Sequence, residues 1–126
     1  MGTWGTGNFD SDGALDNLAE LVDQLVQQIQ DLLGSEDGEG DVDEDGESKL
    51  MPWVHIVGLL STQCKAAPPK PDVVEAWRDK YVKRWDAQID GLDPEPSFKV
   101  GRRAVIIETF DGLLKHSKEF WIRTKG

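Results

Sequence analysis

Two short segments of this chain place acidic oxygens at the spacing of a calcium-binding loop. The first covers residues 8–13 (NFDSDG) and the second covers residues 41–46 (DVDEDG). In such a loop, oxygens at positions one, three and five wrap the cation, glycine at six makes the turn, and a bidentate glutamate at twelve completes the shell. Position twelve is Ala19 in the first segment and Pro52 in the second. Each segment therefore has half of a calcium loop, and the alternatives are a helix N-terminus and an acidic linker.

Nucleophilic catalysis would need the thiol of Cys64 beside a base. His55 is nine residues away, which at about 100° per residue puts the two side chains on opposite faces of one helix. His116 could meet Cys64 only across helices. We therefore expect a semi-buried structural His55 and a Cys64 that packs as a small apolar residue. The chain has no serine-hydrolase elbow, zinc signature or dinucleotide fingerprint, so we predict no catalytic residue and no cofactor.

Carboxylates gather in the first third of the chain. Residues 1–48 hold fourteen of them and no lysine or arginine. Residues 49–126 hold the other ten acids and all fourteen bases, so the net charge of −10 divides into −14 and +4. Such a segment attracts a cationic partner and repels nucleic-acid phosphates. We therefore predict a basic protein partner, no nucleic-acid partner, and a binding surface formed by Asp10, Asp12, Asp16, Glu20 and Asp23.

The basic residues do not form a nucleic-acid signature. The aromatic residues near them are spaced as helix core stripes and are not interleaved with the bases. The cluster can contact phosphate, lie against the acidic first helix, or form a solvated face. Its members are Lys80, Lys83, Arg84, Arg102 and Arg103.

Hydrophobic periodicity predicts the elements that position these groups. Apolar residues that recur every three or four positions, or fill a segment nearly all round, indicate helices at residues 12–33, 50–64, 72–89 and 98–122. Gly34 is a natural stop for the first helix. The second segment favours a central buried helix, although two short strands fit the same length. The predicted fold is all-α, a compact four-helix bundle-like single domain over residues 1–126.

Two segments lie outside this periodicity. Residues 1–9 (MGTWGTGNF) are rich in glycine, and we expect Trp4 and Phe9 to anchor this arm across one end of the bundle. Residues 34–48 (GSEDGEGDVDEDGES) contain one apolar residue, Val42, and are predicted to be a mobile acidic loop.

Compartment and association are predicted from composition. No apolar run reaches the about 20 residues that span a bilayer, and the N-terminus lacks the layout of a secretory signal. The single cysteine excludes an intramolecular disulfide and fits a reducing compartment. We expect a cytoplasmic protein without a membrane partner, and surplus apolar residues on the first helix leave a homodimer open.

Residues 1–16 (MGTWGTGNFDSDGALD) and 77–96 (WRDKYVKRWDAQIDGLDPEP) resemble the small bacterial family catalogued as domain of unknown function 4259. The resemblance implies a bacterial, specifically actinobacterial, origin and a compact single-domain protein. It brings no established reaction, cofactor or catalytic residue.

The leading hypothesis is a non-enzymatic protein-binding module that masks a basic partner in the manner of an immunity protein or antitoxin. The −14 segment and the lack of a self-consistent catalytic group favour it. The alternative is a small enzyme or ligand-binding protein with a carboxylate or divalent-metal site near the N-terminal arm, where several glycines lie beside the acids.

Overall fold

The computed structural model describes residue 3, residues 5–34 and residues 42–125, and across these residues the fold is all-α. A π-helical segment leads directly into the second α-helix, and a 3₁₀ turn follows the third. In chain order the elements are α1 (Asp12–Leu33), η1 (Val42–Leu50), α2 (Met51–Gln63), α3 (Pro71–Gln88), η2 (Ile89–Leu92) and α4 (Pro96–Lys125). The four predicted helices are confirmed, with ends that differ by at most three residues.

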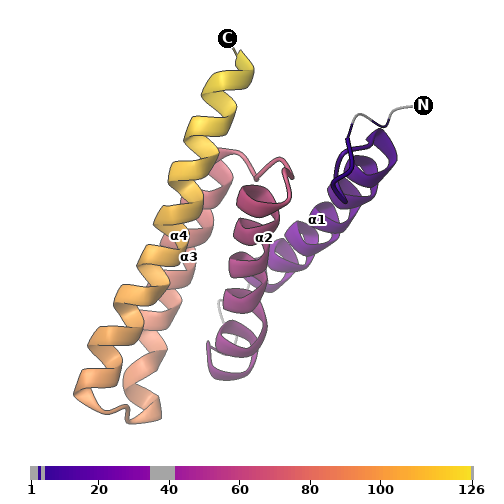
Figure 1. Ribbon diagram of the computed structural model, residues 1–126. Coiled ribbons are helices and arrows are strands. Elements are labelled where there is room, and N and C mark those ends of the chain that lie inside the picture. The colour runs from indigo at the N-terminus through magenta and orange to yellow at the C-terminus, as the bar shows by residue number, and fades with distance from the viewer. Residues whose placement is uncertain (1–2, 4, 35–41, 126) are drawn as a thin grey trace.

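The helices are arranged as a hairpin with two further helices beside it (Figure 1). α3 and α4 pack against each other along their lengths, and α2 packs on α4. α1 contacts α2 and α3 but is inclined to the other helices, so its N-terminal half diverges from them in Figure 1. The outer side of α1 is therefore open to solvent over much of its length.

The core lies between the four helices and η1. The largest of its side chains that are at most 1% exposed are Trp85 on α3 and Phe110 on α4, and the Tyr81 ring lies 6.1 Å from that of Phe110. Burying one large apolar side chain contributes about 1.5–3 kcal/mol, so these residues dominate the stability of the hairpin. Trp77 and Trp85 are thus confirmed as packing residues, whereas Trp4 lies outside the described residues.

Helix α1 has well-defined ends. The Ser11 hydroxyl accepts a hydrogen bond from the Ala14 N–H at 3.1 Å, which satisfies one free donor of the first turn. The Gly34 N–H donates to the Gln30 carbonyl oxygen at 2.7 Å and closes the helix as predicted. Between these caps, one stripe is at most 5% exposed: Leu18, Val22, Ile29 and Leu33.

The predicted loop over residues 34–48 is shorter in the structure, because residues 42–48 form most of η1. Val42 is 2% exposed, and its N–H donates to the Gln88 side chain at 3.0 Å. A single apolar residue therefore anchors the segment because α3 offers it both a buried place and a hydrogen bond. Residues 35–41 of the predicted loop lie outside the described residues.

Helix α2 is less buried than its sequence predicts. Ile56 and Leu59 are 41% and 45% exposed, and His55 is also exposed, so the expectations of all-round burial and of a semi-buried His55 were wrong. Their side of α2 faces away from the core because α1, η1 and α4 cover only the remaining faces. None of the described helices is both long and apolar enough to cross a membrane.

Candidate functional site

Four of the five predicted binding residues form one exposed face of α1. At about 100° per residue, Asp12, Asp16, Glu20 and Asp23 span an arc of about 80°, on the side away from the buried stripe. We call these four residues the acidic face. All four are exposed, and none of them forms an ion pair or hydrogen bond with another side chain in the described part of the chain.

The acidic face is electrostatically unfavourable for α1 itself. Asp12 and Asp16, and Asp16 and Glu20, are four residues apart, and like charges at this spacing destabilise a helix by about 0.2–0.5 kcal/mol per pair. The helix contains no lysine or arginine that could offset them. Beside the face, Leu21 is 48% exposed. The surface therefore combines uncompensated negative charge with one accessible apolar side chain.

Asp10, the fifth predicted residue, lies apart from this face. Its carboxylate accepts the Gly7 N–H and the Lys65 ammonium, each at 2.9 Å. These two hydrogen bonds lower the pKa of Asp10 below its ordinary value of 3.8. A side chain at Gly5 or Gly7 would collide with the same carboxylate, at 2.6 and 2.7 Å. The glycines of the arm therefore make room for Asp10, which ties the arm to the segment after α2.

The described residues do not form either of the two candidate calcium loops. Asp10 turns toward Lys65, whereas Asp12 points outward from the first turn of α1. In the second segment, Asp41 lies outside the described residues, and Asp45 and Gly46 belong to η1. Among the residues that the structure describes, no three histidines, cysteines, aspartates or glutamates are grouped closely enough to hold a metal ion.

Two carboxylates of η1, those of Glu47 and Asp45, are used within the fold. Glu47 accepts two hydrogen bonds from Arg102 Nε, at 2.9 and 3.1 Å, and a further one from Arg102 Nη2. It also accepts the indole N–H of Trp85 at 3.2 Å. Asp45 lies 3.5 Å from the Lys49 ammonium. Glu47 thus joins η1 to both helices of the hairpin, a role that the sequence did not indicate.

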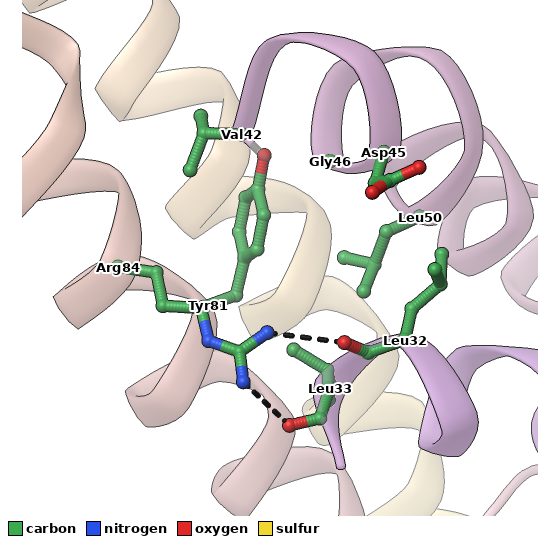
Figure 2. A pocket seen from close by; sticks show the side chains of 8 residues that line it. All are labelled: Leu32, Leu33, Val42, Asp45, Gly46, Leu50, Tyr81 and Arg84. Atoms are coloured by element: carbon green, nitrogen blue, oxygen red, sulfur yellow. Dashed lines mark hydrogen bonds between the residues drawn. The ribbon is translucent and has the colours of Figure 1, made fainter. Parts of the chain in front are cut away.

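Arg84 and Tyr81 of α3 join α1 to η1 (Figure 2). The Arg84 guanidinium donates to the carbonyl oxygens of Leu32 and Leu33, at 3.1 and 2.7 Å, and so caps the C-terminus of α1 with a positive charge. The Tyr81 hydroxyl lies against Gly46 in a hollow of about 10 Å³ and has no hydrogen-bond partner in the described structure. Burial and the charge of Glu47 raise the pKa of Tyr81, so the hydroxyl stays protonated.

The predicted basic cluster is dispersed in the structure. Arg84 caps α1, Arg102 binds Glu47, and Arg103 binds Asp86 through two hydrogen bonds at 2.9 and 3.0 Å. The cluster therefore supplies internal structural contacts from three of its five members. Arg84 lies against the acidic first helix, one of the alternatives left open by the sequence, but it binds carbonyl oxygens of the last turn and not the carboxylates. Arg102 and Arg103 bind carboxylates of η1 and α3 instead.

Cys64 is partly buried and packs against the core, as predicted for a small apolar residue. The His116 ring lies 6.5 Å from the Phe120 ring at an interplanar angle of 48°, and its Nε2 is buried without a hydrogen-bond partner in the described residues. His55 is exposed within α2, whereas Cys64 is partly buried at the C-terminal end of that helix.

Fold and site together define a small all-α protein whose outermost helix carries an unpaired acidic face. The family model described as "Domain of unknown function (DUF4259)" matches residues 2–121, and the chain belongs to this family. No curated protein and no solved structure matches the chain.

Proposed function

We propose that this protein is a non-enzymatic protein-binding module of the bacterial cytoplasm that masks a basic partner through the acidic face, as immunity proteins and antitoxins do. One observation carries the proposal. The carboxylates of α1 are exposed without internal counterions, while Asp10 and Glu47 from the same acidic third are paired with lysine or arginine. A cationic partner would supply the missing counterions.

The geometry of α1 supports this role in two further ways. A rigid helix presents four carboxylates in one stripe, so a partner can meet them at little cost in conformational entropy. Leu21 beside the stripe can act as an apolar anchor, since interfaces rely on a few buried apolar side chains while charges set the association rate and the specificity. The affinity should therefore fall as salt is added.

The test compares two variants that lose the same charge. The first neutralises the acidic face as Asp12→Asn, Asp16→Asn, Glu20→Gln and Asp23→Asn. The matched control neutralises four exposed carboxylates of the hairpin as Asp72→Asn, Glu75→Gln, Glu95→Gln and Glu119→Gln. These carboxylates also lack side-chain partners in the described structure, and Asp72, like Asp12, lies in the first turn of a helix.

Immobilised wild-type and variant proteins are exposed to lysate of the native host at about 50 mM and about 500 mM salt, and bound proteins are quantified by mass spectrometry. We expect a basic protein that is retained by the wild type and the control at low salt and reduced by about tenfold for the acidic-face variant. Equal retention by both variants, or no basic protein at low salt, contradicts the proposal. Light scattering of the free protein tests the separate prediction of a homodimer.

A further inference from the structure

A groove runs between α2 and α4, and Glu47 of η1 lines one end of it. It consists of two adjoining hollows of about 220 and 380 Å³, which share His55, Val105 and Thr109 as lining residues. The lining on α4 extends from Arg102 to Leu113, which corresponds to roughly 16 Å along the helix axis. The groove is therefore elongated, with the Glu47–Arg102 pair at a polar end and a mostly apolar end at Leu113, where Glu108 is the one charged lining residue among those described.

Two glycines keep the apolar end open. A Cβ atom added at Gly58 on α2 or Gly112 on α4 would meet no atom within 4 Å, so no close approach inside the chain requires glycine there. Glycine weakens a helix interior relative to alanine. At the rim, Leu59 and Val105 are 45% and 46% exposed. The helices thus accept two unfavourable residues, and the result is an accessible apolar trough.

At the polar end of the groove, the acceptor Glu47 is already occupied, whereas the donor Arg102 still has an N–H group without a partner in the described part of the chain. Glu47 already accepts the bonds of Arg102 Nε and Nη2 and of the Trp85 indole. Arg102 Nη1 has no partner among the described residues, although the Arg102 side chain is 24% exposed and lines the groove. A ligand group placed here can therefore accept a hydrogen bond from Arg102, whose planar guanidinium suits a carboxylate, and the charge of Glu47, which also lines this end, is balanced by the ion pair.

We propose that the α2–α4 groove binds a small amphiphilic carboxylate, with its head on Arg102 and its apolar body along Val105, Leu59 and Leu113. His55, exposed on the opposite wall, adds a second donor near the head. The pairing of Arg102 with Glu47 fixes the guanidinium in place, so the head meets an oriented donor. This site is independent of the acidic face on α1.

The experiment is a titration of the isotope-labelled full chain, followed by amide chemical shifts. Four probes distinguish the contribution of the charged head group from that of the apolar chain: octanoate, 1-octanol, octylammonium and acetate. We expect octanoate to bind with millimolar affinity, to shift the amides of Gly58, Thr109 and Gly112, and to bind about fivefold more tightly than 1-octanol or octylammonium. Acetate at the same concentration should leave these amides unchanged. Equal binding of octylammonium or 1-octanol, or no shifts with octanoate, overturns the proposal.

Two glycine variants locate the site. Gly112→Leu fills the trough, and we expect the octanoate affinity to fall at least about tenfold. Gly101→Leu makes the same change on the same helix, also at a position where a Cβ meets nothing within 4 Å, and should bind octanoate as the wild type does. Circular dichroism verifies that both variants fold. Wild-type affinity in Gly112→Leu overturns the proposed location, and so does an equal loss in the two variants.

Discussion

The acidic third of the chain contains two regions with the same charge and opposite roles. In η1, Glu47 lies between Arg102 and the Trp85 indole, and it connects three elements of the fold. On α1, the acidic face lies in solvent without counterions in the described structure. The difference arises because Val42 anchors η1 against the hairpin, whereas α1 is inclined away from it. The role of a carboxylate here therefore depends on whether its segment is packed against the hairpin. A carboxylate on a packed segment pairs with the hairpin, and one on the diverging helix stays available for binding.

The largest expected effect comes from changing one glutamate in each region. Glu47→Ala leaves Arg102 and the Trp85 indole without their shared acceptor, and we expect the free energy of unfolding to fall by about 2 kcal/mol. Glu20→Ala removes an exposed carboxylate that is three residues from Asp23 and four from Asp16, and should change it by less than about 0.5 kcal/mol. Urea denaturation measures both, and similar losses in the two variants would abolish the distinction between the regions.

An effect of comparable size tests whether η1 packs on the hairpin. A Cβ at Gly46 would lie 2.8 Å from Tyr81 Cε1 and 3.0 Å from Cζ, so Gly46→Ala should destabilise the protein by about 1–3 kcal/mol. Gly13→Ala in the first turn of α1 meets nothing within 4 Å, and should be neutral or stabilising by up to about 1 kcal/mol. Thermal melts of the two variants compare a packed segment with an exposed one.

Tyr81→Phe refines the same measurement. The hydroxyl is buried and has no hydrogen-bond partner in the described residues, so its removal alone should cost less than about 0.5 kcal/mol. In the Gly46→Ala background the substitution removes the atom nearest to the new methyl group and should restore part of the lost stability. A double-mutant cycle without coupling between the two positions would show that η1 does not rest on Tyr81.

The helices were predictable from the sequence because their apolar spacing and caps are local signals. The spacing from Leu15 to Leu33 and the stop at Gly34 fixed α1, and the same spacing placed four carboxylates on its outer face. The structural roles of Glu47 and Arg102 were not predictable, because they are 55 residues apart and depend on how η1 meets α4. The exposure of His55 and Leu59 was missed for a related reason: an all-apolar segment does not indicate which of its faces remains uncovered.

The smallest expected effect concerns Asp10, which is partly buried and paired with a base, as Glu47 is. The hydrogen bonds from Lys65 and Gly7 lower the pKa of Asp10 in the folded protein. Its contribution to stability is therefore present above pH 3.8, the ordinary pKa, and is lost as the pH falls through the lower pKa of the folded state. The melting temperature of Asp10→Asn should therefore lie slightly below that of the wild type at pH 6, and the gap should narrow below about pH 4. Lys65→Met removes the partner and should shrink the gap at pH 6, since only the Gly7 N–H then distinguishes the carboxylate. If the difference in melting temperature between the wild type and Asp10→Asn stays constant from pH 6 to pH 3, the Asp10 carboxylate is not stabilised by its partners and resembles the unpaired acids of α1.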